Sequence, residues 1–183
     1  MKKNAFTLIE VLVAVGIFSL VMGMVSAILL SAISLQRKNL AVQRLLDQTS
    51  YALEYMSRTL RMAKKQTTDL PSCITQNYNY EISRGGYGIK FIDEQDVCHE
   101  FYWDSSLRQL KEVKGTQESF LTPEELEVTN FKINLSGEYG EDEKQPRLTI
   151  LLQIKGRRGL VEEFPEIKIQ TTISQRRLDI PSQ

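Results

Sequence analysis

The chain has 183 residues, with 23 basic and 23 acidic side chains and therefore no formal net charge. This length allows one domain with a hydrophobic core, or a small domain with an appended segment. The charge balance argues against a dedicated nucleic-acid-binding protein, and the 42% hydrophobic content argues against a disordered chain. The charges are unevenly placed, because Glu10 is the only charged residue between Lys3 and Arg37.

The uncharged run from Val11 to Leu35 predicts a membrane-spanning helix. Its 25 residues would form a helix about 38 Å long, against a hydrocarbon core of about 30 Å. Lys2 and Lys3 precede the run and favour a cytoplasmic N-terminus. A secretory signal peptide cleaved after Ala27 is the alternative. The continued apolar run beyond that residue and the carboxylate of Glu10 count against it.

The segment from Lys2 to Glu10, KKNAFTLIE, followed by a long apolar run, resembles the N-terminal signal of type IV pilins and pseudopilins. The resemblance implies that a prepilin peptidase cuts between Ala5 and Phe6 and that the new terminal Phe6 is methylated. It also implies that Glu10 stays in the membrane and serves filament assembly. The new amine of Phe6 can pair with Glu10 of a neighbouring subunit and set the axial register. Ala5 stands where the family usually has Gly.

Residues 37–66 continue without Gly or Pro and predict an amphipathic half of the same helix. One face is formed by seven residues that are spaced alternately by four and three. These residues are Val42, Leu46, Thr49, Leu53, Met56, Leu60 and Ala63. Leu45 and Ala52 broaden the face. We expect it to pack on a sheet, and a coiled-coil dimer is the alternative.

From Asn77 the pattern changes to the two-residue period of β-strands. The expected strands are 78–82, 87–91, 97–103, 107–113, 128–135, 148–154 and 167–173. Thr122–Glu125, with Pro in the first turn, is expected to begin a short helix. The longer strands each have one apolar face. The sequence therefore predicts an α+β fold in which the long N-terminal helix packs on an antiparallel sheet, as in the pilin architecture.

The expected organisation has four segments. They are a leader peptide (1–5), the membrane and assembly half of the helix (6–36), its amphipathic half (37–66) and a β-rich globular domain (67–183). If that domain lies outside the cytoplasm, Cys73 and Cys98 can form a disulfide. It would close a 26-residue loop and contribute about 3.5 kcal/mol. Two free buried thiols are the alternative.

The resemblance also bears on the subtype, because major type IV pilins typically have a disulfide-bounded loop near the C-terminus. No cysteine follows Cys98, and this departure favours a minor pilin or a pseudopilin.

Other candidate sites in the sequence predict surface features. His99 is the only histidine, with no CxxC motif beside it, so we expect no metal and no cofactor. Four acidic residues between 138 and 143 predict a solvated loop, since they lack the spacing of a calcium-binding loop. The basic pairs 64–65, 157–158 and 176–177 have acidic neighbours, and we do not expect DNA to be a partner. No catalytic motif is present, so the chain is expected not to be an enzyme.

The sequence thus predicts a minor pilin or minor pseudopilin, similar to the J-type pseudopilins of type II secretion or to a minor type IV pilus subunit. The expected partners are the prepilin peptidase, other subunits bound through the N-terminal helix, the inner-membrane assembly platform and the lipid bilayer. Before assembly it would be a single-pass protein of the inner or sole membrane. The N-terminus would be cytoplasmic and the globular domain periplasmic or extracellular. The alternative is a membrane-anchored or Sec-secreted β-domain with a binding role and no filament assembly.

Overall fold

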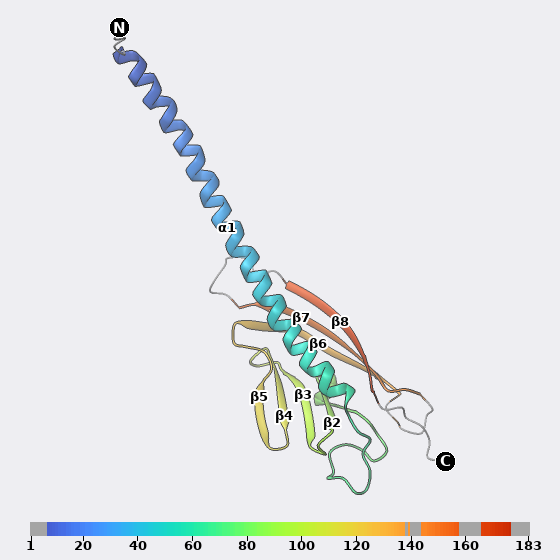
Figure 1. Cartoon of the computed structure of the whole chain (residues 1–183). Coiled ribbons are helices and arrows are strands. Elements are labelled where there is room, and N and C mark those ends of the chain that lie inside the picture. The colour runs from blue at the N-terminus through green and yellow to red at the C-terminus, as the bar shows by residue number, and fades with distance from the viewer. Residues whose placement is uncertain (1–6, 138, 140–143, 158–165, 177–183) are drawn as a thin grey trace. The chain divides into compact units, whose positions relative to one another are not determined.

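The computed structural model describes residues 7–137, 139, 144–157 and 166–176. Helix α1 (Leu8–Arg61) comes first, and among the described residues eight strands and one short 3-10 turn follow it (Figure 1). The internal contacts divide the chain into two compact units, residues 1–41 and residues 42–183. The division falls inside α1, so the first part of the helix and the last part have different surroundings.

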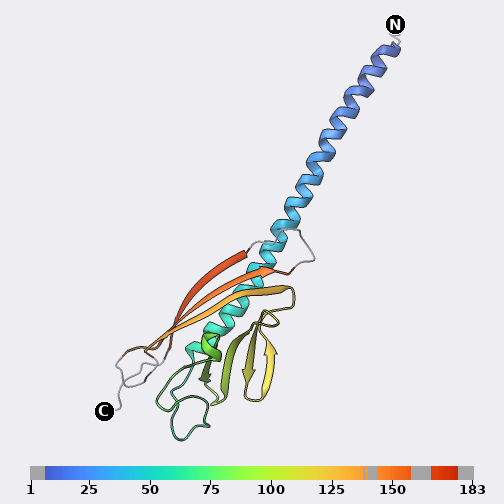
Figure 2. The same cartoon turned by 180° about the vertical axis from the view of Figure 1, so that it is seen from behind.

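The strands form two antiparallel sheets within the second unit (Figures 1 and 2). The five-stranded sheet has the order β1-β2-β3-β4-β5, and the three-stranded sheet has the order β6-β7-β8. The bounds are β1 Glu81–Ser83, β2 Gly88–Ile92, β3 Cys98–Asp104, β4 Gln109–Lys114, β5 Gln117–Phe120, β6 Leu126–Ser136, β7 Arg147–Gly156 and β8 Glu166–Ser174. The 3-10 turn η1 (Arg84–Gly86) joins β1 to β2. The α+β class with a long N-terminal helix and antiparallel strands is confirmed.

Four expectations differ from the structure. Strand β5 was not expected, and the strands divide between two sheets. The expected strand 78–82 is shortened, because Tyr78 accepts a backbone hydrogen bond from Gln66 at 2.9 Å outside the sheet. The expected helix at Thr122 is a turn. The Thr122 hydroxyl accepts a hydrogen bond from the Leu110 N–H at 3.0 Å, so it holds the end of the sheet and does not cap a helix.

The buried stripe of α1 is narrower than the face that the sequence predicts, although every buried residue belongs to that face. Its buried members are Leu45, Thr49, Ala52, Met56 and Leu60. Leu46 was expected on this face, yet its side chain is 42% exposed, and Val42 and Leu53 are half-buried. Thr49 can be buried because its hydroxyl donates to the Leu45 carbonyl at 2.6 Å.

The stripe belongs to one hydrophobic cluster together with both sheets. The five-stranded sheet contributes Ile89, Phe91, Phe101 and Leu110, all fully buried. The three-stranded sheet contributes alternating residues of β7, as the sequence predicts: Leu148, Ile150, Leu152 and Ile154. Because the amphipathic half of α1 buries one stripe, the two sheets share that stripe and form one core.

Side chains and backbone from distant parts of the chain complete the C-terminal end of α1. The Tyr80 hydroxyl donates to the Leu60 carbonyl at 2.6 Å, and the Gln175 amide donates to the Ala63 carbonyl at 2.7 Å. The Arg176 N–H donates to the Arg61 carbonyl at 2.9 Å. The last carbonyl groups of a helix have no partner further along it, so these contacts give the end of α1 partners from distant parts of the chain.

Candidate functional site

The candidate site lies at the beginning of α1. Thr7 precedes the helix, and Glu10 is in its first turn. The Glu10 Oε2 atom accepts hydrogen bonds from the Thr7 backbone N–H at 3.2 Å and from the Thr7 hydroxyl at 3.3 Å. The Glu10 N–H donates back to the Thr7 carbonyl at 3.1 Å. A Thr followed three residues later by Glu is the pattern of a capping box, in which the acid satisfies a donor at the helix start.

This cap gives Glu10 a local role that sequence reasoning about assembly alone misses. The signal for it was the Thr-x-x-Glu spacing itself. A carboxylate is favourable in this position because the N-terminal end of a helix carries a partial positive charge. Glu10 is exposed, and its carboxylate accepts hydrogen bonds from two atoms of Thr7. Ala5 and Phe6, where cleavage and methylation are predicted, lie outside the described residues.

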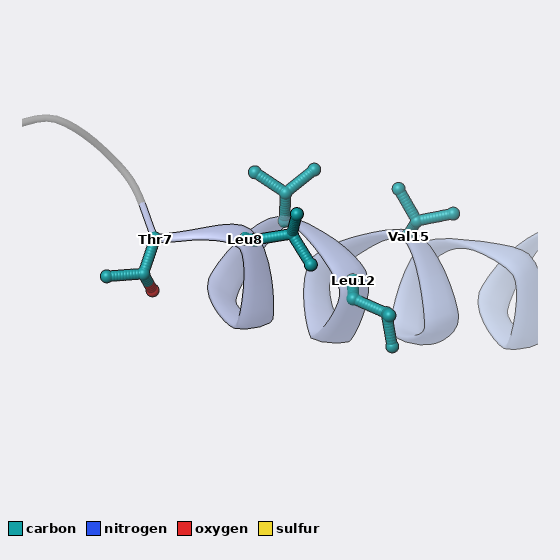
Figure 3. Close-up of a pocket in the computed structure, with 5 residues that line it drawn as sticks. Thr7, Leu8, Leu12 and Val15 are labelled. Carbon is teal, nitrogen blue, oxygen red and sulfur yellow. The ribbon is translucent and has the colours of Figure 1, made fainter.

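The first part of α1 exposes its apolar side chains on every face. Large apolar residues from Leu8 to Leu35 are between 40% and 83% exposed. Thr7, Leu8, Val11, Leu12 and Val15 line a shallow apolar hollow along the first turns (Figure 3). The helix is long and apolar enough, by length and composition, to cross a membrane. A helix that is apolar all round needs lipid or other helices around it.

Three serine hydroxyls of this segment form hydrogen bonds within the helix. The Ser19 hydroxyl donates to the Val15 carbonyl at 2.9 Å, and the Ser26 hydroxyl donates to the Met22 carbonyl at 2.8 Å. The Ser34 hydroxyl makes a similar bond to the Ser31 carbonyl at 2.8 Å. Hydrocarbon offers no hydrogen bonds, so hydroxyls that bond back to the helix fit a membrane environment.

The two cysteines of the second unit are joined. A disulfide links Cys73 to Cys98, with the Cα atoms 5.5 Å apart. It ties the loop after α1 to the first residue of β3. Gln66 organises the same loop, since its side-chain oxygen accepts the N–H groups of Cys73 and Ile74 at 3.1 Å and 3.3 Å.

The basic pairs are only partly described. Lys64 lies 2.5 Å from the Asp96 carboxylate, and Arg157 donates to the Leu107 carbonyl at 3.0 Å. Arg158 and Arg177 lie outside the described residues, as do residues 138 and 140–143 of the acidic run. In the part of the chain that the structure describes, no group of three or more His, Cys, Asp or Glu side chains is arranged to hold a metal.

A buried ionic cluster surrounds His99, which sequence reasoning treated as an isolated residue. The His99 side chain is 1% exposed, with Nε2 lying 2.9 Å from Asp93 Oδ2 and Nδ1 lying 3.0 Å from Glu112 Oε1. Glu112 also accepts the Tyr55 hydroxyl at 2.8 Å. Lys114 lies 3.6 Å from Asp93. The cluster connects α1, the turn after β2, and strands β3 and β4.

The pKa values of the two acids in this cluster are lowered. Burial alone would raise the pKa of Glu112, but the contacts with His99 and then Tyr55 outweigh burial and lower it. Burial would also raise the pKa of Asp93. The Val97 N–H, which donates to Asp93 at 2.9 Å, and the charge of His99 outweigh it. Both acids are therefore carboxylates at neutral pH.

The comparisons with known proteins bear on the N-terminal segment. Residues 1–26 match the family model described as the prokaryotic N-terminal methylation motif. The comparisons with curated proteins and with solved structures gave no match. The matched segment contains Ala5, Phe6 and Glu10, and this motif implies processing by a prepilin peptidase. The methylation motif at residues 1–26 supports a relation of this chain to the type IV pilin and pseudopilin family, and the motif leads into the exposed apolar part of α1.

Proposed function

We propose that the protein is a minor pilin or minor pseudopilin, a structural subunit of a type IV pilus-like or type II secretion filament. The prepilin peptidase would cut between Ala5 and Phe6, and Phe6 would be methylated. The single observation that carries the proposal is the methylation motif at residues 1–26, which continues directly into the exposed apolar helix. The N-terminus would be cytoplasmic and the globular unit periplasmic or extracellular before assembly.

The assembly role of Glu10 rests on its charge and position. Cleavage would create a cationic amine at Phe6, four residues from the carboxylate in sequence. Opposite charges attract strongly where water is excluded, so the amine of one subunit can bind Glu10 of its neighbour. The hydrogen bonds from Thr7 hold the Glu10 carboxylate at the start of the helix. The amine of a neighbouring subunit could bind it there.

The minor subtype is supported by the position of the disulfide. Cys73 and Cys98 are used in a bridge between the loop after α1 and β3. This bridge differs from the disulfide-bounded loop near the C-terminus that is typical of major type IV pilins. We propose further that the subunit acts by packing and recognition and is not an enzyme. Other subunits, the assembly platform and the membrane would be its partners, and no cofactor is proposed.

The first experiment is mass spectrometry of the N-terminus of the protein made in cells that contain a prepilin peptidase. The proposal expects a chain that begins with methylated Phe6. A chain that still begins with Met1 or Lys2 would support a membrane-anchored domain with a binding role. A chain that begins at Ile28 would support a Sec-secreted domain. Either of these two results contradicts the proposal.

The second experiment separates the charge of Glu10 from its capping role. Glu10→Gln keeps a side-chain oxygen that can accept the Thr7 N–H, but it removes the charge. We expect correct processing and a folded β-domain, with a loss of incorporation into filaments as large as that of Glu10→Ala. Thr7→Val serves as the control, because it removes the hydroxyl of the cap and keeps the carboxylate. Normal incorporation of Glu10→Gln would contradict the charge-pairing role.

A further inference from the structure

Strand β8 differs from the other edge strands of the two sheets. It forms one edge of the three-stranded sheet (Figure 1). Its 9 residues include no Pro and no Gly, and its pairing with β7 runs without a register shift. The edge strands β1 and β5 have only three and four residues, and β6 has a register shift between Val128 and Asn130. Short edges and bulges prevent unwanted strand pairing, and β8 has neither.

The backbone of β8 carries a row of hydrogen-bonding groups that point away from β7. The Gln175 N–H donates to the Pro146 carbonyl at 3.3 Å, which continues the pairing beyond Ser174. In an antiparallel pair, residues that exchange hydrogen bonds alternate with residues whose groups point to the other side. The odd-numbered residues from 167 to 173 therefore bond to β7. The even-numbered residues from 166 to 174 point away from it, where no described strand pairs with them.

The hydrophobic core is incomplete along the same edge. Leu152 and Ile154 of β7 are 1% and 0% exposed. Their cross-strand partners Ile169 and Ile167 lie on the same face of the sheet, yet both are only half-buried. The difference arises because β7 has a strand on each side, whereas β8 has a strand on one side only. A further strand beside β8 would cover the open flank of these two side chains.

We propose that the edge of β8 binds an extended segment of another protein chain, which joins the three-stranded sheet as a further strand. An extended backbone matches this edge, because its own donors and acceptors recur at every second residue. Every second side chain of the bound segment would be apolar and would lie beside Ile167 and Ile169. The main-chain hydrogen bonds would supply affinity, and these side chains would supply selectivity.

Charge complementarity adds an acidic residue to the description of the partner. Lys168 is exposed on the outer face of the sheet, in one row with the uncharged residues Gln153 and Asn130. An acid opposite Lys168 in the added strand would form a cross-strand ion pair. A second copy of β8 does not offer this acid. Antiparallel pairing along the whole strand, centred on Gln170, would place Thr172 opposite Lys168. The partner is therefore a different chain.

The test measures hydrogen exchange by NMR in the full-length protein in detergent micelles. The probe is the synthetic peptide Thr-Val-Asp-Val-Thr-Val-Thr, and the comparison peptide has Lys in place of Asp. Without peptide, the odd-numbered amides of β8 should be protected and the even-numbered amides should exchange fast. With the Asp peptide at about ten times its Kd, exchange of the even-numbered amides should slow about tenfold. The Lys peptide should bind more weakly.

Two results of this measurement would overturn the proposal. If the even-numbered amides are protected before peptide is added, another part of the chain or a second copy already occupies the edge. If the Asp peptide leaves their exchange unchanged, the edge does not accept an added strand.

Variants test the backbone contribution. Gln170→Pro removes an N–H that points away from β7, and proline is tolerated at such edge positions. This variant should keep the urea stability of wild type and lose peptide binding. Thr171→Pro removes an N–H that bonds to β7, so it should destabilise the sheet. Peptide binding by folded Gln170→Pro at the wild-type Kd would overturn the proposal.

A charge reversal tests the acidic partner residue without changing the backbone. Lys168→Glu should reverse the preference, so that the Lys peptide binds more tightly than the Asp peptide. Lys132→Glu is the matched control, because Lys132 is also exposed on the outer face but lies on β6, away from the β8 edge. It should keep the wild-type preference. An unchanged preference in Lys168→Glu would overturn the proposed charge pairing.

Discussion

The Tyr55 hydroxyl lies within hydrogen-bond distance of both carboxylate oxygens of Glu112, 2.8 Å from Oε1 and 3.0 Å from Oε2. The two residues are 57 positions apart, one on α1 and the other on β4. The Tyr55 ring also packs edge-on against Phe101, with the centroids 6.1 Å apart. This side chain therefore joins the helix to the sheet by an apolar contact and by a polar one.

Removal of this hydroxyl should destabilise the globular unit. Burial, followed by the hydrogen bond and the charge of Glu112, raises the pKa of Tyr55 to about 12, so the hydroxyl is a donor at neutral pH. Tyr55→Phe should lower the free energy of unfolding by about 1.5–3 kcal/mol, as for a hydrogen bond to a charged group. Urea unfolding followed by fluorescence of Trp103, the only tryptophan, measures the change. Tyr51→Phe is the control, since Tyr51 is 74% exposed, and an equal loss in both variants would contradict the assignment.

Acid should destabilise the five-stranded sheet through Glu100. Burial favours the protonated acid. The hydrogen bonds from Arg84 at 3.0 Å and 3.2 Å, and the bond from Ser83 at 2.6 Å, outweigh burial and lower the pKa of Glu100 from 4.5. A carboxyl group whose pKa is lower in the folded state than in the unfolded state stabilises the fold at pH values above its unfolded-state pKa. This stabilisation is lost as the pH falls through the folded-state pKa.

The measurement for Glu100 is urea unfolding at neutral pH and at about pH 4. Wild type should lose more stability between these conditions than Glu100→Gln, whose side chain does not titrate. Glu54→Gln is a suitable control, because Glu54 is a surface residue paired with Arg58 on the same helix. If Glu100→Gln retains the full acid dependence of wild type, Glu100 does not contribute to it.

Reduction of the disulfide should weaken the unit without abolishing its topology. The bridge joins residues that are 25 positions apart. A crosslink of this span contributes about 3–4 kcal/mol by restricting the unfolded chain. Urea unfolding with and without reductant should show a loss of this order. The double variant Cys73→Ser/Cys98→Ser should be equally weak under both conditions, and a reductant effect on that variant would assign the loss to another cause.

The burial pattern of α1 can be tested by truncating two apolar residues of the predicted face. Met56 is fully buried in the shared core, whereas Leu46 is 42% exposed. Met56→Ala should lower the free energy of unfolding by about 2–4 kcal/mol. Leu46→Ala should cost less than about 1 kcal/mol. Equal losses of unfolding free energy in the two variants would indicate that Leu46 packs in the core, as the sequence pattern predicts. Chemical unfolding of the full chain distinguishes the two results.

The sequence predicted the helix, most strands and the N-terminal motif, because each of these depends on local pattern. In the run 148–154 every second residue is apolar, and the structure buries Leu148, Ile150, Leu152 and Ile154 of that face. The helix stripe was less certain, because Leu45 and Leu46 are both apolar and local pattern alone cannot choose between them. The choice is made by the sheets that pack on α1.

The ionic cluster could not be predicted, since it depends on strand register. His99 and Lys114 are direct partners across β3 and β4. This pairing places His99 near Glu112, and the helix then brings Tyr55 to the same acid. Phe120 and the rest of β5 were missed for another reason. All four residues of β5 are exposed, so the strand has no buried apolar face. A search for alternating apolar residues therefore does not detect it.

The contacts at the end of α1 have a consequence for biosynthesis. The Gln175 amide that bonds to the Ala63 carbonyl is separated from it by 112 positions, and the Arg176 N–H that bonds to the Arg61 carbonyl comes one residue later. A ribosome would complete α1 long before either donor is made. The last turn of the helix can therefore acquire these partners only after translation has reached residue 176, so the first element synthesised is among the last to be completed.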